Sequence, residues 1–429
     1  MVTEYRWIAN LMPTFRNGRL AQAVLLFTNF FLIITALYHL KPASRSIFVT
    51  ALGSDRLPYV WIATAVGLGL LITVYHRLIE RHSRLNVVLA TCAIIIACLI
   101  GFYPSLPHSA FVLPFAFYIF VDMLSVVLVE QFWSLTNTAY STDQGKRWYG
   151  LIATGGLLGG VAGGVLSATW VERLGLDTFD LLPVAAGIVA LLMLLSVLMG
   201  RLGLYVEQPG VANHDEAERD QWHFIAKHRY LFLIAAILLL AQVVEPLVEF
   251  QFMKMVETHI EGREARTVYL ADVFGILSAV AIAVNLLITP LIHRWLGALG
   301  GLFAQPLSVM AGSLYFMSNA TLLAGSALKI ADRGLSYSIN RASKELLYIP
   351  IDPVLIFKAK AWIDMFGYRM FKVLGSLLIL LLTQWLPWSL SARDLGWLVL
   401  ATCLLWMYAL VRLGGEYRRV SARAAAAAR

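Results

Sequence analysis

The sequence predicts an all-α integral membrane protein with about twelve transmembrane helices, arranged as two six-helix halves. The first observation is composition: 59% of the 429 residues are hydrophobic and 14% are charged, whereas a soluble domain has roughly 25% charged residues. The second is that apolar residues form continuous runs of about 20, the length of a bilayer-spanning helix. The third is one long polar stretch, at 205–228, which lies midway along the runs.

The apolar runs follow one another along the chain. Strands of an outer-membrane barrel would alternate polar and apolar residues instead, so continuous runs indicate helices. The predicted spans are 20–40, 57–76, 86–103, 109–136, 149–171, 178–204, 229–249, 267–292, 297–318, 320–345, 362–386 and 395–413.

The polar stretch 205–228 predicts a cytoplasmic linker. It separates an N-terminal half, 1–204, from a C-terminal half, 229–414, and a cytoplasmic tail follows at 415–429. Two six-helix halves joined in this way are typical of major-facilitator transporters. We therefore expect a major-facilitator-type fold.

Basic residues indicate which loops face the cytoplasm. They gather before the first run, after the second, fourth and tenth runs, and behind the last one, whereas the loops at 104–108, 318–320 and 386–392 have no Lys or Arg. These positions share one side of the membrane if the chain has an even number of spans. We expect both termini in the cytoplasm and a location in the bacterial inner membrane.

No motif of an enzyme, a cofactor site or a metal site appears in the chain. Cys92, Cys98 and Cys403 lie inside apolar runs and lack the spacing of metal ligands. The net charge of +8 follows from the basic cytoplasmic loops, so we expect no nucleic-acid partner. We also expect a monomer in the lipid bilayer.

Glycines cluster in the fifth run, at Gly155, Gly156, Gly159, Gly160, Gly163 and Gly164. Small residues spaced four apart allow membrane helices to approach closely. The cluster therefore predicts a tightly packed helix.

Lys41 and Arg45 are charged residues at the end of the first run, on either side of Pro42. They are four residues apart, so they share one face of a helix. One interpretation is a cap whose side chains reach the membrane interface. The other is contact with an anionic substrate inside a longer, bent helix, since an apolar segment continues after Arg45.

Asp122 lies in the middle of the fourth run, and Glu130 follows two helical turns later. A charge at membrane depth is costly, so it usually faces a cavity or a partner. Asp122 could bind a proton or a cation, or it could form an ion pair with Lys41 or Arg45.

Glu245 and Glu249 flank Pro246 in the seventh run, and Lys254 follows. Two glutamates four residues apart repel each other unless a positive group lies between them. That group could be a cation, a proton or a basic side chain, so these residues are candidates for coupling or for salt bridges.

The tenth run has the highest density of charges in the chain. Arg341 and Lys344 are three apart on one helical face, and the preceding turns contain Lys329, Asp332 and Arg333. Together with Lys41 and Arg45, Arg341 and Lys344 would form a cationic chamber suited to phosphate or carboxylate groups.

Three segments resemble the nucleotide transporter (ATP/ADP translocase) family of plastids and intracellular bacteria. They are RASKELLYIPIDPVLIFKAKAWIDMFGYRMFKVLGS (341–376), EQFWSLTNTAYSTDQGKRWYGLIATGGLLGG (130–160) and YHLKPASRSIFVTALGSDRLPY (38–59), the last resembling the version found in free-living bacteria. The resemblance implies a twelve-helix carrier of the major-facilitator type, in which charges of helices 1, 4, 7 and 10 serve substrate binding and exchange.

By motif position, the resemblance assigns the helix 10 lysine of the family to Lys344, the helix 4 acid to Asp122 and the helix 7 acid to Glu249. The chain departs from the family in helix 1. Where the exchangers have an Arg-Asp-Thr-Lys-Asp-like stretch, this chain has residues 41–45, Lys-Pro-Ala-Ser-Arg.

Three functions remain open at this stage. The leading hypothesis is a secondary transporter of an organic anion, a nucleotide such as ATP or ADP or a related phosphorylated metabolite. The alternative is a proton-coupled major-facilitator carrier of another small solute, such as a siderophore or a drug. A membrane receptor or assembly factor without transport activity is the third.

Overall fold

The computed structural model describes residues 19–140, 142–205, 228–348, 363, 367–387 and 389–427. Within these ranges the chain is helical and has no β-strand. Most of the predicted linker and part of the motif at 341–376 lie outside the described residues. The all-α fold predicted from the sequence is confirmed.

The first part of the chain forms six long helices. They are α2 (Arg19–Leu52), α3 (Leu57–Arg81), α4 (Arg84–Ser105), α5 (Val112–Ala139), α6 (Thr142–Leu174) and α7 (Leu181–Arg201), with short helical turns η1 (Ser54–Arg56), η2 (Leu106–His108) and η3 (Thr178–Asp180). Each of them overlaps one of the first six predicted spans, and α2, α3, α4 and α6 contain theirs entirely.

The second part of the chain is also helical. Its elements are α9 (Arg229–His259), α10 (Arg263–Ala283), η4 (Val284–Ile288), α11 (Thr289–Ser318), α12 (Leu322–Leu335), η5 (Ser336–Asn340), α13 (Arg341–Leu347), α15 (Tyr368–Leu380), η7 (Leu381–Trp385) and α16 (Leu395–Ala427). The segments η4, η5 and η7 are π-helical turns, which are wider than α-helical ones.

Eight helical segments of the described residues are long and apolar enough to cross a membrane. The longest of them, Arg263–Ser318, has 56 residues and contains two of the predicted spans. It breaks at Gly297, whose φ of +68° favours glycine. The break coincides with the predicted boundary between the spans 267–292 and 297–318.

The chain folds into two compact units. Unit 1 comprises Met1–Leu52, Val66–Val211 and Gly262–Ala279, and unit 2 comprises Gly53–Ala65, Ala212–Glu261 and Val280–Arg429. Two short segments therefore belong to the unit formed mainly by the opposite half of the sequence.

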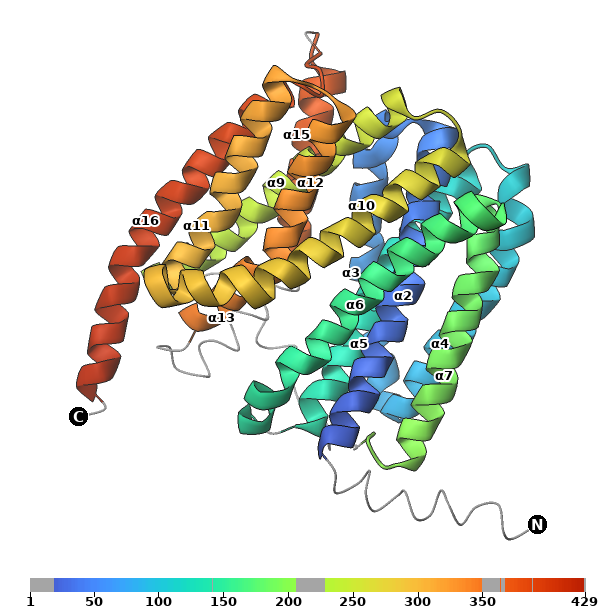
Figure 1. The fold of residues 1–429 in the computed structure, drawn as a ribbon, viewed down its shortest axis with the longest axis horizontal. Helices are drawn as coiled ribbons and strands as arrows, with labels where there is room; N and C mark the ends of the chain where they lie inside the picture. Colours follow the sequence, from blue (N-terminus) through green and yellow to red (C-terminus); the bar gives the residue numbers. More distant parts are fainter. Residues whose placement is uncertain are drawn as a thin grey trace. The chain divides into compact units, whose positions relative to one another are not determined.

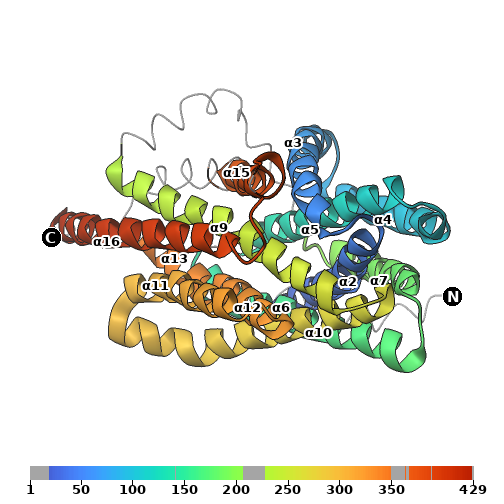
Figure 2. The same ribbon diagram turned by 90° about the horizontal axis from the view of Figure 1, so that it is seen from above.

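In unit 1, helix α2 packs against α5, α6 and α7 (Figures 1 and 2). It is longer than the predicted span 20–40, because it continues through Pro42 to Leu52. Proline cannot donate a hydrogen bond to the carbonyl four residues earlier, which here belongs to Tyr38. The hydroxyl of Ser167 in α6 donates to that carbonyl at 3.3 Å, so a neighbouring helix satisfies the group that Pro42 leaves without its usual helical donor.

The glycine cluster of α6 makes the contact with α2 possible. A Cβ atom at Gly155 or Gly159 would lie 2.5 Å from the backbone oxygen of Phe27 or Phe31. On another face of α6, a Cβ atom at Gly164 would lie 2.6 Å from the backbone oxygen of Ala271 in α10. The glycines therefore allow backbone-to-backbone packing, as the sequence predicts.

In unit 2, helix α9 packs against α12, α15 and α16, and α11 packs against α12 and α16 (Figure 2). The predicted span 229–249 is too short, because α9 continues to His259. Close approach of α15 to α9 depends on Gly375, where a Cβ atom would lie 2.6 Å from the Pro246 ring and 2.9 Å from the Val243 oxygen. This contact places the polar residues of α15 beside the glutamates of α9.

Candidate functional site

Unit 1 contains a buried ion pair between Arg45 of α2 and Asp122 of α5. The guanidinium nitrogen lies 2.5 Å from the carboxylate oxygen, and the two side chains are only 9% and 13% exposed. Arg45 also donates to the Ser44 hydroxyl at 3.0 Å, and its guanidinium lies 4.5 Å from the centre of the Tyr118 ring. Arg45, one of the two cations that the sequence offers to Asp122, forms an ion pair with it.

The other candidates of unit 1 lie near this pair along their helices. Lys41 is half-buried one turn before Arg45 on α2, and Glu130 is exposed two turns after Asp122 on α5.

Unit 2 contains a network of three acids and three bases, which we call the charge network. It consists of Glu245 and Glu249 of α9, Lys329, Asp332 and Arg333 of α12, and Lys372 of α15. Its formal charges therefore balance when every group is ionised.

Two ion pairs form the centre of the charge network. Lys329 binds Glu249 and Arg333 binds Glu245. Since each helix presents two charges four residues apart, and the later acid meets the earlier base, α9 and α12 pair in antiparallel register. We call these two ion pairs the ladder. The ladder offsets the repulsion between the two glutamates, because each glutamate is paired with a cation.

Lys372 extends the charge network to α15. Its amine lies 3.3 Å from the Glu245 carboxylate, so Glu245 forms ion pairs with both Arg333 and Lys372. Lys372 lies three residues before Gly375, where α15 approaches α9 closely. Sequence reasoning missed Lys372, although a lone lysine in the apolar run of residues 370–380 was a signal for it.

Asp332 is the most buried acid of the charge network, with 2% of its surface exposed. One of its carboxylate oxygens accepts a hydrogen bond from the Gln305 amide of α11 at 2.9 Å. The other lies 3.6 Å from the Arg333 guanidinium. Arg333 therefore lies between two carboxylates, those of Asp332 and Glu245.

Arg341 and Lys344 lie further along the chain than Lys329, Asp332 and Arg333. Lys344 lies eleven residues after Arg333, which corresponds to roughly 16 Å along a helix. Its amine donates to the Tyr368 hydroxyl at 2.9 Å, and Arg341 is exposed. Lys329, Arg333 and Lys372 are bases that meet the glutamates of α9.

Lys254 pairs with acids at the end of α9 rather than with Glu245 or Glu249. Its amine lies 2.9 Å from Asp55 of η1 and 3.2 Å from Glu257. Glu257 in turn binds the hydroxyl of Ser54. Lys254 thus connects η1 to α9 within unit 2.

Unit 1 contains a second ion pair, which is partly exposed and lies at the start of α10. The Arg263 guanidinium lies 3.0 Å from both oxygens of Asp177 and 4.0 Å from the centre of the Phe179 ring. Sequence reasoning did not single out this pair, because both residues lie in short polar segments between apolar runs.

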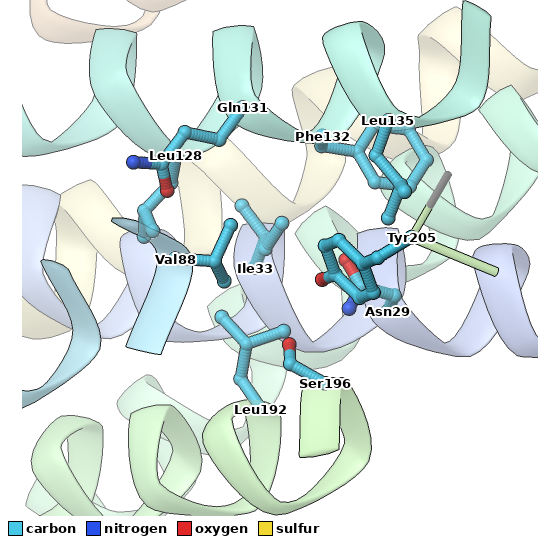
Figure 3. Close-up of a pocket in the computed structure, with 10 residues that line it drawn as sticks. All are labelled: Asn29, Ile33, Val88, Leu128, Gln131, Phe132, Leu135, Leu192, Ser196 and Tyr205. Carbon is cyan, nitrogen blue, oxygen red and sulfur yellow. The ribbon is translucent and has the colours of Figure 1, made fainter. Parts of the chain in front are cut away.

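Unit 1 also contains a small pocket between α2, α4, α5 and α7 (Figure 3). The lining residues are uncharged: Asn29, Ile33, Val88, Leu128, Gln131, Phe132, Leu135, Leu192, Ser196 and Tyr205. The pocket therefore lacks a counter-charge for an anion. The charged residues, and not this pocket, form the candidate site.

Comparison with known proteins confirms the resemblance seen in the sequence. A family described as TLC ATP/ADP transporter matches residues 317–417. ADP,ATP carrier protein 5 of Rickettsia conorii is 23% identical over 350 residues, which are 69% of this chain and 68% of the relative. ADP,ATP carrier protein 2 of Chlamydia pneumoniae is 26% identical over 354 residues, which are 70% of this chain and 65% of the relative. The chain thus spans about two thirds of the length of these curated relatives.

Solved structures of transporters share the fold. A bacterial homologue of the iron transporter ferroportin, in an inward-facing state, has a TM-score of 0.62 at 15% identity, covering 92% of this chain and 98% of that one. Nucleoside transporter NupG has a TM-score of 0.58 at 14% identity, covering 93% of this chain and 98% of that one. These similarities confirm the major-facilitator-type fold.

Proposed function

We propose that this chain, a relative of the ATP/ADP transporter family, is a secondary transporter of an organic anion. Its substrate would be a nucleotide, exchanged as ATP against ADP, or a related phosphorylated metabolite. It would work by alternating access in a bacterial inner membrane, with both termini in the cytoplasm. The names of the curated relatives support the nucleotide, and the fold supports transport.

The main structural support is the ladder of Glu249–Lys329 and Glu245–Arg333. An unpaired charge inside an apolar helix bundle is costly, so the ladder neutralises the bases when no substrate is bound. Phosphate oxygens accept hydrogen bonds from Arg and Lys as carboxylate oxygens do. A bound phosphate group can therefore replace a glutamate without leaving a base unpaired.

This competition would favour exchange over net movement. Without a substrate, the ion pairs hold α9 and α12 together. With a nucleotide bound, the bases keep a partner while the helices move. An empty carrier that had to separate the ladder would leave buried charges uncompensated, at a cost of several kcal/mol per ion.

Arg45 and Asp122 form an equivalent pair in unit 1. Because Arg45 is held by Asp122, Ser44 and the Tyr118 ring, its guanidinium is oriented before any ligand arrives. A planar guanidinium binds phosphate with two parallel hydrogen bonds. We propose that Arg45 and Lys41 can each pair with an anionic group.

The proposed function is tested by uptake of labelled ATP into proteoliposomes preloaded with ADP, ATP, phosphate or nothing. We expect uptake only with internal nucleotide, and a loss of uptake in Lys329→Gln. Lys254→Gln is the matched control, because Lys254 is more exposed and lies outside the charge network. Absence of uptake under every loading, by folded protein, would refute nucleotide exchange.

The same assay decides between the proposal and the two other functions. A proton-coupled carrier of a siderophore or a drug would take up no ATP, and its transport would stop when the proton gradient is dissipated. A receptor or assembly factor would keep its function when Glu249 or Lys344 is neutralised.

A further inference from the structure

The charge network of unit 2 contains one acid that the proposed exchange does not use. Asp332 pairs with no cation of its own in the ladder, since Lys329 binds Glu249 and Arg333 binds Glu245. Its nearest charged contact is the Arg333 guanidinium at 3.6 Å. Asp332 nevertheless completes the balance of three negative and three positive charges.

We propose that Asp332 is a proton-binding site, and that anion binding to Lys329, Arg333 and Lys372 is linked to uptake of a proton by the Asp332 carboxylate. The proposal rests on the proposed function, because it concerns the same bases. The step is a protonation, in which the carboxylate takes one proton from a hydronium ion of the solvent and releases water. It becomes a neutral carboxylic acid and contributes one negative charge less to the network.

The first reason is the charge balance. With Asp332 ionised, the network is neutral, and an entering anion would make it negative. With Asp332 protonated, one positive charge is left over, which attracts the anion. Linkage is reciprocal, so an anion that occupies the bases also favours the proton on Asp332.

The second reason is burial. Glu245 and Glu249 have side chains that are 19% and 12% exposed, so water can solvate them when a phosphate displaces them. Asp332 is 2% exposed and cannot turn to water. A buried carboxylate that loses its compensating cation is very costly as an anion and tends to be neutralised. Asp332 is therefore the acid of the network that most needs the proton.

The third reason is the neutral partner of Asp332. An amide has both donors and an acceptor, so Gln305 can form a hydrogen bond with either form of the acid. Its nitrogen donates to Asp332 at 2.9 Å. Its oxygen is buried and has no hydrogen-bond partner among the described residues, so an acceptor is available next to the acid.

The surroundings of Asp332 contain several other titratable or charged groups. Among the described residues, they are Glu245 and Glu249 on α9, Lys329 and Arg333 on α12, Lys372 on α15 and Cys403 on α16, while α11 contributes the uncharged Gln305. The glutamates are the competing sites for the proton, so the test must separate them from Asp332.

The experiment measures protons taken up per ATP bound, by titration calorimetry of the purified protein in buffers of different ionisation enthalpy. The pH is chosen so that ATP is fully ionised. We expect uptake of on the order of one proton by the wild type, and an affinity that rises up to about tenfold for each unit of decrease in pH. Asp332→Asn, which mimics the protonated acid, should take up none and should have a nearly constant affinity.

Two further variants make the result specific. Asp332→Glu keeps a titratable group and should restore proton uptake. Asp394→Asn removes a carboxylate in the turn before α16, and it should behave like the wild type. Unchanged proton uptake in Asp332→Asn, or equal behaviour of Asp332→Asn and Asp332→Glu, would overturn the inference.

Inorganic pyrophosphate is titrated in parallel with ATP. If pyrophosphate binds with proton uptake and ATP does not bind, the nucleotide proposal fails while the inference stands. If ATP binds to the wild type without proton uptake, the inference fails while the nucleotide proposal stands. If neither anion binds, both are refuted.

Discussion

Arg333 of α12 and Glu245 of α9 form an ion pair inside unit 2, with side chains that are 12% and 19% exposed. Nothing in the local sequence links them, because 88 residues separate position 245 from position 333. The pair exists because two helices with charges four residues apart meet in antiparallel register. It forms the centre of the proposed anion site.

Removing one charge of the ladder should destabilise the protein strongly. Glu249→Gln would leave Lys329, which is only 6% exposed, without its carboxylate. Breaking a buried pair costs about 3–5 kcal/mol, so we expect a clear decrease in the thermal unfolding temperature in detergent. The double variant Glu249→Met with Lys329→Met should cost less than the single one. A loss in the double variant equal to the sum of the losses in the two single variants, Glu249→Met and Lys329→Met, would mean that the pair does not interact.

Exposed ion pairs should behave differently. Asp177→Asn would break the contact with Arg263, whose side chain is 26% exposed against 46% for Asp177. Pairs that water reaches contribute about 0–1 kcal/mol, and salt weakens them. We expect a small loss of stability in the variant. At high ionic strength the difference in stability between the variant and the wild type should become smaller still. A loss as large as that of Glu249→Gln would show that exposure does not decide the difference.

Arg45 should not be replaceable by lysine. The guanidinium binds Asp122 and lies on the Tyr118 ring, and a lysine amine lacks the planar fork that binds phosphate with two hydrogen bonds. We expect Arg45→Lys to lower ATP uptake by about tenfold or more, corresponding to roughly 1.4 kcal/mol. Arg56→Lys, in the short turn η1, serves as the matched control. Wild-type uptake in Arg45→Lys would exclude this role for Arg45.

Replacing either of two glycines of α6 with alanine should change the stability of the protein, in opposite directions for the two positions. At Gly150 a Cβ atom meets nothing within 4 Å, and alanine favours helices by up to about 1 kcal/mol over glycine. At Gly159 the same atom would lie 2.5 Å from the Phe31 oxygen of α2, and overpacking costs about 1–3 kcal/mol. We expect Gly150→Ala to raise the unfolding temperature and Gly159→Ala to lower it. The same sign in both would contradict close packing of α2 and α6.

Lys344 should matter less than Lys329 for transport. Lys344 donates to the Tyr368 hydroxyl, whereas Lys329 neutralises Glu249. In the uptake assay, Lys344→Ala should keep a larger share of activity than Lys329→Ala. The reverse order would restore Lys344 as the main base of the tenth run, which is the assignment made from motif position.

Much of the fold follows from local sequence. Each predicted span overlaps a helix of the described residues. An apolar run of about 20 residues can be recognised from the sequence without knowing which helices pack against it. The ends of α2 and α9 were misjudged. A proline and several charges suggested that these helices stop, and only Ser167 of α6, which donates to Tyr38, shows how α2 continues.

The candidate site was predicted in part. Glu245 and Glu249 stood out because they repel each other on one helical face, and a cation, a proton or a basic side chain was expected between them. Lys329 and Arg333 have the same spacing, which was the available signal for their pairing. A lone lysine in an apolar run was a signal for Lys372 itself, but neither Lys372 nor Gln305 indicated its partner, since a single polar residue does not show which residue it contacts.

By itself, the sequence determined that this protein is a helical membrane protein, and it showed roughly where the helices lie and that several charges lie within them. These properties depend on the free energy of transferring residues from water to an apolar phase. Each residue contributes to that free energy according to its own side chain, so the contribution can be read from the sequence. The tertiary structure alone decided which acid meets which base and that Asp332 is placed beside a neutral amide. Ion pairs depend on distances of a few ångströms between side chains on different helices, and helix packing sets those distances.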